Sequence, residues 1–74
     1  MNEIITVLRA LREEEGMNKN IKSKIDIIIT HLESDPVLGK DKALSEFEDM
    51  IDQNNIEPHI RTEMYSIVSM LESL

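Results

Sequence analysis

The chain has 74 residues and no cysteine, and its 15 acidic side chains against 8 basic ones give a net charge of −7. A chain of this length folds as one small domain, the lack of cysteine excludes disulfides and thiolate metal sites, and the negative charge argues against nucleic acid because phosphate repels it on average. The longest apolar run, residues 27–29, is far shorter than the ~18 residues of a membrane span, and the chain does not begin with a signal-peptide pattern, so we expect a cytoplasmic protein with no membrane partner.

Apolar side chains recur with the period of an α-helix in four segments, which we place at about residues 3–15, 19–34, 42–54 and 58–73. The second and fourth segments share one spacing, i, i+4, i+7, i+8, i+11, which starts at Ile21 in one and at Ile60 in the other. No segment shows the sustained two-residue alternation of a strand. The pattern therefore predicts an all-α protein.

The second half of the chain repeats the first. A shift of 39 positions aligns residues 2–35 with residues 41–74 without a gap. Apolar residues coincide at ten of the aligned positions, about twice the number that random placement gives. We interpret each half as one helical hairpin.

The residues that start and end helices also coincide in the two halves. Asn2 aligns with Asp41, and both residue types accept hydrogen bonds from the free amides of a first helical turn. Gly16 aligns with Asn55, the two residue types that most readily end a helix in the left-handed conformation. Residues 36–40 contain a proline and a glycine and are predicted to be a linker between the hairpins.

Two hairpins of this kind bury both of their apolar stripes when they pack against each other about a pseudo-two-fold axis. We therefore predict a single domain over residues 1–74, an antiparallel four-helix bundle made of two tandem helical hairpins.

Three short motifs stand out from the periodic pattern. The fourth segment begins with Pro-His-Ile-Arg-Thr at residues 58–62 and continues to Ser-Met-Leu-Glu at 69–72, and Asn-Ile-Lys stands at 20–22. Together they resemble the small archaeal uncharacterised protein family (UPF) number 0147, over nearly the whole chain. The resemblance implies an all-helical fold and an archaeal source. It implies no activity and therefore no catalytic residues.

The sequence contains no recognisable catalytic or metal-binding constellation. We find no phosphate-binding glycine loop, no histidine pair at i, i+4 and no nucleophile with an evident base. We therefore expect no enzymatic activity, no catalytic residue, no cofactor and no metal. His31 and His59 are the two histidines, and we interpret each as a helix-end or surface residue. A metal site shared with carboxylates is the alternative.

Two charged clusters have both a structural and a functional interpretation. His59, Arg61 and Thr62 stand at the start of the fourth segment, where they fix the adjoining loop or, alternatively, hold a small anion with the free amides of the helix start. Three consecutive glutamates, residues 13–15, close the first segment at its negative pole. We interpret them as a solvated helix end, with a docking patch for a basic partner as the alternative.

Some apolar residues have no apolar counterpart in the other half of the chain. Ile27, Tyr65, Met70 and Leu74 also widen the apolar faces of their segments beyond a single stripe. We predict that these four residues form an exposed apolar patch that pairs with another molecule, in one version a second copy of the chain, which gives a homodimer.

The leading functional hypothesis is a non-catalytic protein–protein interaction module whose protein partner is unknown. The alternative is an accessory factor of a ribonucleoprotein or other nucleic-acid assembly, which the chain would contact through Lys19, Lys22 and Lys24 or Arg61. A small metal-dependent or ligand-dependent enzyme is the third hypothesis.

Overall fold

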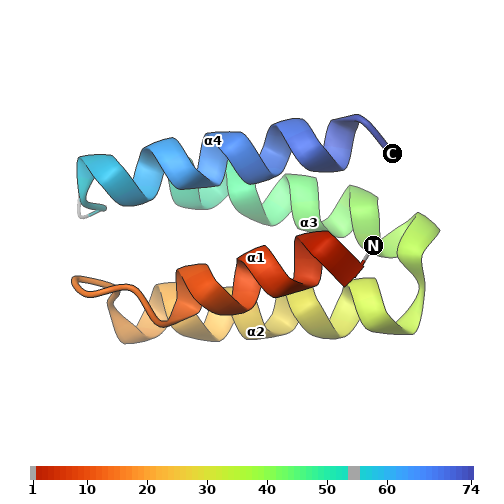
Figure 1. Cartoon of the computed structure of the whole chain (residues 1–74), viewed down its shortest axis with the longest axis horizontal. Coiled ribbons are helices and arrows are strands. Elements are labelled where there is room, and N and C mark those ends of the chain that lie inside the picture. The colour runs from red at the N-terminus through yellow and green to blue at the C-terminus, as the bar shows by residue number, and fades with distance from the viewer. Residues whose placement is uncertain (1, 54–55) are drawn as a thin grey trace.

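The computed structural model describes residues 2–53 and 56–74, which form four helices. These are α1 (Asn2–Arg12), α2 (Lys19–Ser34), α3 (Pro36–Ile51) and α4 (Pro58–Glu72). Neighbouring helices run in opposite directions, and the start of α1 and the C-terminus lie beside the α2–α3 turn (Figure 1). Because α1 contacts α2 and α4, and α3 contacts the same two helices, the predicted antiparallel four-helix bundle is confirmed. None of these four helices has both the length and the apolar character that a membrane span requires.

The apolar stripes of all four helices meet in one core. Each of the ten apolar positions that coincide in the two halves of the sequence is buried or half-buried. Seven of these positions are buried in both halves: Ile4 with Ala43, Leu8 with Phe47, Leu11 with Met50, Ile21 with Ile60, Ile25 with Met64, Ile28 with Ile67, and Leu32 with Leu71. The two halves therefore contribute equivalent positions to the core. Burial of its apolar area is the dominant favourable term in folding.

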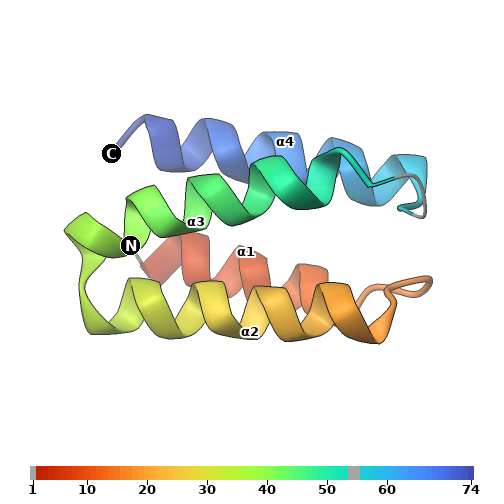
Figure 2. The same cartoon turned by 180° about the vertical axis from the view of Figure 1, so that it is seen from behind.

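The predicted linker at residues 36–40 is wrong, because these residues form the first turns of α3. A single residue, Asp35, separates α2 from α3 and serves both helices (Figure 2). Its N–H donates to the carbonyl of His31 at 3.0 Å, while its Oδ1 accepts from the amides of Val37 and Leu38 at 3.1 and 3.3 Å. Pro36 follows at the first helical position, where the missing amide costs nothing. The proline therefore starts a helix here.

Gly39, predicted to break the helix, lies inside α3 where this helix meets the backbone of α2. A Cβ atom on Gly39 would lie 2.5 Å from the carbonyl oxygen of His31 and 2.8 Å from its carbonyl carbon. Both atoms belong to the backbone of a buried helix face, so they cannot move aside as a flexible side chain can. Glycine is needed here because it lets two helices touch.

The remaining boundaries also differ from the expected ones. α1 ends at Arg12, so residues 13–15 lie in the following turn and do not close the helix as predicted. Their negative charges still lie beside the negative pole of the helix, where Arg9 and Arg12 in its last turn oppose them. Gly16 has the expected left-handed φ of +84°. It does not directly follow the helix, however, because α1 ends four residues earlier, at Arg12. Its predicted counterpart Asn55 lies outside the described residues.

The third and first helices start differently from the prediction as well. Asp41, predicted as an N-cap, is an exposed residue inside α3, and Asn2 is itself the first residue of α1. α3 ends at Ile51 and not near residue 54. α2 and α4 start at the predicted residues: the side chain of Asn18, not singled out in the sequence, caps α2, and Pro58 occupies the first position of α4.

Replacing Gly39 by alanine should destabilise the protein by about 1–3 kcal/mol, as overpacking does, although alanine favours an isolated helix by about 1 kcal/mol. Thermal and urea unfolding of Gly39→Ala measures the change. Ser45→Ala, at an exposed position of α3, is the control and should stay within about 0.5 kcal/mol of the parent. A more stable Gly39→Ala protein would show that the two backbones do not touch.

Replacing Asp35 by alanine should cost about 0.5–2 kcal/mol, because the amides of Val37 and Leu38 lose their acceptor. Asp41→Ala is the matched control, since Asp41 is the N-cap expected from the sequence alone. Urea unfolding of both variants decides between the two positions. A larger loss for Asp41→Ala would place the start of α3 where the sequence pattern put it.

Candidate functional site

The four residues of the predicted apolar patch do not come together. Ile27 is 49% exposed on α2, and α2 does not contact α4, which carries Tyr65 and Met70. Tyr65 and Met70 are five residues apart on α4 and so point about 140° away from each other. Met70 and Leu74, in contrast, line one hollow on the side of α4 that faces α1. The prediction of a single patch is therefore wrong, and two of its four residues belong to the surface described next.

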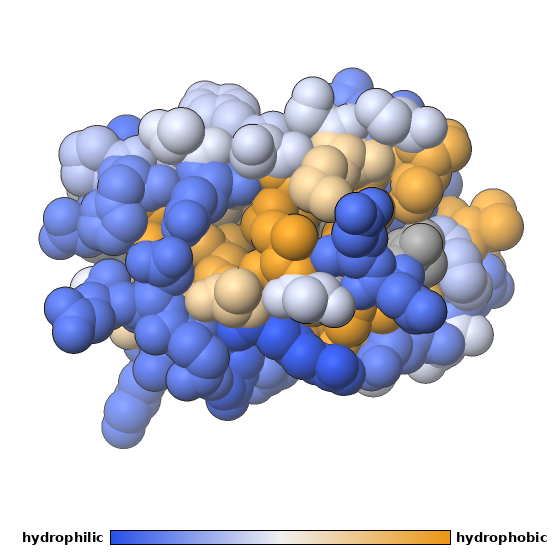
Figure 3. Space-filling view, in the orientation of Figure 1, coloured by the Kyte–Doolittle hydropathy of each residue, from blue (hydrophilic) through white to orange (hydrophobic). Residues whose placement is uncertain are grey.

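An open groove runs between α1 and α4 at the surface of the bundle. One stretch encloses about 330 Å³ and is lined by Val7, Ala10, Leu11, Glu14, Glu63, Ser66, Ile67 and Met70. A second stretch of about 270 Å³ shares Met70 with the first and adds Glu3, Ile4, Ser73 and Leu74. We call these residues together the α1–α4 groove. In Figure 3 apolar atoms are visible between the two helices and again at the end that holds the C-terminus.

The helical repeat explains how the sequence builds this groove. Val7 and Ala10 on α1 are three residues apart, and Glu63, Ser66 and Met70 on α4 follow the spacing i, i+3, i+7, so each set lies on one side of its helix, while Glu14 lies in the turn after α1. Val7 and Ala10 were not among the predicted site residues. Both are apolar in the first half of the chain only, and this asymmetry was the signal that could have identified them.

Carboxylates stand at both ends of the α1–α4 groove. Glu14 and Glu63 lie at the end near the interhelical loops and Glu3 lies at the other end, and no basic side chain lines either stretch. Glu63 Oε2 is buried and has no hydrogen-bond donor. Burial raises the pKa of Glu63, the neighbouring Glu14 carboxylate raises it further, and His59 opposes the shift. The lining of the groove is therefore acidic, and the basic groups beside its ends are His59 near Glu63 and Lys40, whose Nζ donates to the carbonyl of Leu74 at 3.3 Å.

Ion pairs cross two of the other three seams between neighbouring helices, and among the described residues none joins α3 to α4. The pairs are Arg9–Glu33 at 3.2 Å and Arg12–Asp26 at 2.6 Å between α1 and α2, and Lys24–Glu46 at 3.5 Å between α2 and α3. Within residues 2–53 and 56–74, no ion pair joins α1 to α4. Exposed pairs of this kind add little stability, but they make the α1–α2 seam polar: its open hollow is lined mainly by charged side chains, those of Arg9, Arg12, Glu13 and Asp26.

The predicted cluster of His59, Arg61 and Thr62 lies at the loop end of the bundle. Arg61 is half-buried and donates to the carbonyl of Ile51 at 3.2 Å and to that of Gln53 at 2.8 Å. It thus satisfies carbonyls that the end of α3 leaves without a helical partner. Thr62 donates to a carbonyl of its own helix, and His59 is exposed. These contacts fix the end of α3 against the start of α4, and they engage two of the guanidinium N–H groups that an anion would need.

The basic residues of the nucleic-acid hypothesis do not form a free basic surface. Lys24 pairs with Glu46 on α3 and Arg61 is bound to carbonyls, while Lys19 is exposed and Lys22 is half-buried. His31 is half-buried at the end of α2. Among the described residues, no three histidine, aspartate or glutamate side chains lie close enough together to hold a metal ion.

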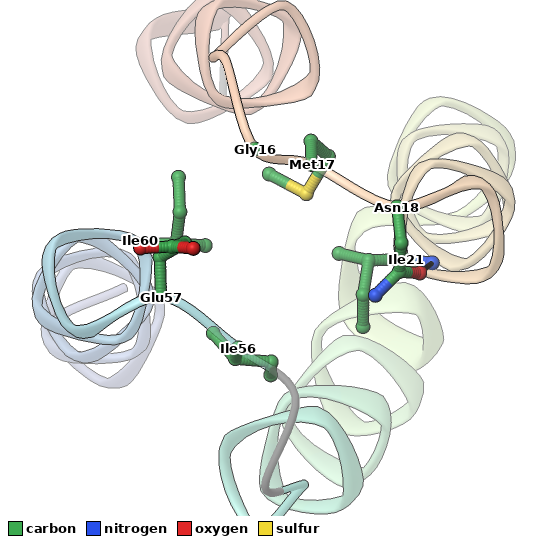
Figure 4. A pocket seen from close by; sticks show the side chains of 7 residues that line it. All are labelled: Gly16, Met17, Asn18, Ile21, Ile56, Glu57 and Ile60. Atoms are coloured by element: carbon green, nitrogen blue, oxygen red, sulfur yellow. Dashed lines mark hydrogen bonds between the residues drawn. The ribbon is translucent and has the colours of Figure 1, made fainter.

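A small enclosed hollow lies between the two loops at the end of the bundle (Figure 4). It is lined by Gly16, Met17, Asn18, Ile21, Ile56, Glu57 and Ile60 and has a volume of about 10 Å³. A space of that size holds one water molecule at most, and only where several polar groups surround it. Most of its lining is apolar, so we interpret it as a packing gap.

Glu63→Gln tests the electrostatics of the groove. The folded protein raises the pKa of Glu63, so folding favours the neutral carboxyl. Glu63 therefore stabilises the folded protein at a pH below the pKa that it has in the unfolded chain. This stabilisation is lost as the pH rises through its pKa in the folded protein. The neutral glutamine should therefore raise Tm at pH 7, and this gain should shrink as the pH falls toward 4. Circular dichroism melts from pH 4 to 8 measure it, with Glu48→Gln on the exposed side of α3 as control. A lower Tm for Glu63→Gln at pH 7 would contradict the raised pKa of Glu63 in the folded protein.

Comparison with known proteins identifies a family but no described relative. A family model described as "Uncharacterised protein family (UPF0147)" matches residues 1–74. No curated protein and no solved structure matches the chain. The match confirms the resemblance that the motifs at residues 20–22, 58–62 and 69–72 carry. Because the family model covers the whole chain, the protein belongs to this uncharacterised family.

Proposed function

We propose that the protein is a non-catalytic protein–protein interaction module that receives a segment of its partner in the α1–α4 groove. One observation carries the proposal: this seam holds an open groove whose lining is mostly apolar. Val7 is 36% exposed and Leu74 is 56% exposed, so apolar side chains face solvent along it. Contiguous apolar surface of this kind is typical of interaction sites.

The dimensions of the groove suit a helix of a partner. From Glu3 to the end of α1 at Arg12 the groove follows this helix for about 13 Å, or two and a half helical turns. Amphipathic helices dock in apolar grooves through side chains at i, i+3, i+4 and i+7, a span of about 10 Å that fits within this length. We therefore expect the partner to contribute a helical segment.

Binding, and not catalysis, is the role that the lining of the groove supports. Its ionisable groups are three carboxylates, Glu3, Glu14 and Glu63, and most of the other lining residues are apolar. The nucleic-acid hypothesis has weaker support, because Lys24 and Arg61 are engaged within the bundle.

Site-specific photo-cross-linking tests the proposal. A benzophenone amino acid is placed at Val7 in the groove or, as the control, at Ile27 on the far helix α2, where the side chain is also exposed. After irradiation in cells of the native host, we expect a discrete cross-linked protein from position 7 that is absent from position 27. Equal products at both positions, or none at position 7, would contradict the proposal.

A further inference from the structure

We propose that the α1–α4 groove binds a basic amphipathic helix, one whose apolar face is flanked by lysine and arginine. This inference rests on the proposed function and names the chemistry of the partner. It combines two independent properties of the groove, the shape of its apolar floor and the sign of the charge at its ends.

The floor of the groove is shaped by small residues between larger ones. Ala10 on α1 and Ser66 on α4 are both exposed and line the same stretch, between the larger side chains of Val7 and Met70. The small side chains leave a hollow above the buried Leu11 and Ile67. Large apolar side chains of a partner helix would fill this hollow and remove apolar surface from water.

The charge at the ends of the groove determines which flanking residues fit. Glu14 and Glu63 lie at one end and Glu3 at the other, with no basic residue among the lining residues. Residues 13 and 15, next to Glu14 in the same turn, are also exposed glutamates. A lysine or arginine beside the apolar face of the partner would pair with these carboxylates. The net charge of −7 would also speed its approach.

The raised pKa of Glu63 agrees with this arrangement. Its carboxylate is partly desolvated and close to a second carboxylate, and His59 offsets these two effects only in part. A bound cation would add a nearby opposite charge, which is one of the three causes that lower the pKa of an acid.

The same charges argue against a second copy of the chain as the occupant. In a two-fold symmetric dimer the same surface faces itself, so an interface built on the groove would bring Glu3, Glu14 and Glu63 of one copy against the same residues of the other. An acidic partner helix would meet the same repulsion. The groove therefore distinguishes a basic helix from both of these occupants.

Peptide binding by fluorescence anisotropy tests the inference. Three labelled peptides of about 18 residues, or five turns, are compared. The first has leucine at i, i+3, i+4 and i+7 and lysine or arginine beside this face, the second has glutamate in place of the basic residues, and the third is a scrambled form of the first without an apolar face. We expect the first peptide to bind and the other two to bind at least about tenfold more weakly.

Variants of the groove then locate the binding site. Replacing Glu14 and Glu63 together by glutamine should weaken binding of the basic peptide about fivefold, the effect of losing two partly exposed ion pairs. Ser66→Lys places a positive charge in the groove and should weaken it further, whereas Ser45→Lys, exposed on α3, is the matched control and should leave affinity unchanged. Both serines are exposed, so neither variant disturbs the core.

Several results would overturn the inference. Equal affinity for the basic and acidic peptides would do so, as would no binding of the basic peptide or equal effects of Ser66→Lys and Ser45→Lys. A dimer in light scattering that Ser66→Lys dissociates would place a second copy in the groove and overturn it too. If Val7 still yields a discrete cross-linked partner in these cases, the proposed function survives and only the basic helix is wrong. If Val7 yields none, the proposed function itself fails.

Discussion

The contact between Gly39 and the backbone of His31 determines how the bundle is arranged. Asp35 alone connects α2 to α3, so the ends of these helices cannot separate, and the missing side chain at Gly39 lets their backbones touch. The two hairpins are therefore held together along α2 and α3. The helices within each hairpin are joined by six-residue loops, whereas α1 and α4 are joined by no loop and leave the groove between them.

The helices and the core could be predicted from the sequence because they depend on local periodicity. The ten apolar positions that coincide in the two halves all lie in or beside the core. The α2–α3 junction could not be predicted in this way, because proline and glycine, the residue types of Pro36 and Gly39, each have two structural roles. A proline ends a helix or occupies its first position, and a glycine breaks a helix or lets another backbone approach. Which role Pro36 and Gly39 have depends on the packing of α3 against α2, and the local sequence pattern carries no information about that packing.

The candidate site was predicted only in part for a related reason. Periodicity shows which side of a helix faces away from the core, but it does not show which neighbouring helix flanks that side. Met70 and Leu74 face α1 and line the groove, while Tyr65 and Ile27 lie on other faces. The pairing of Glu14 with Glu63 joins residues from different halves of the chain, and only the packing of α1 against α4 brings them together.

The absence of a loop between α1 and α4 has a consequence for selectivity. These two helices can move apart without stretching a chain connection, and the close α2–α3 pair on the opposite side of the bundle can stay in place as they do. The width of the groove can thus adjust to side chains of different size. The carboxylates stay at its ends during such a movement, since each is attached to α1, to α4 or to the turn that follows α1. A partner helix bound as proposed would therefore be selected by its charge more than by the size of its side chains.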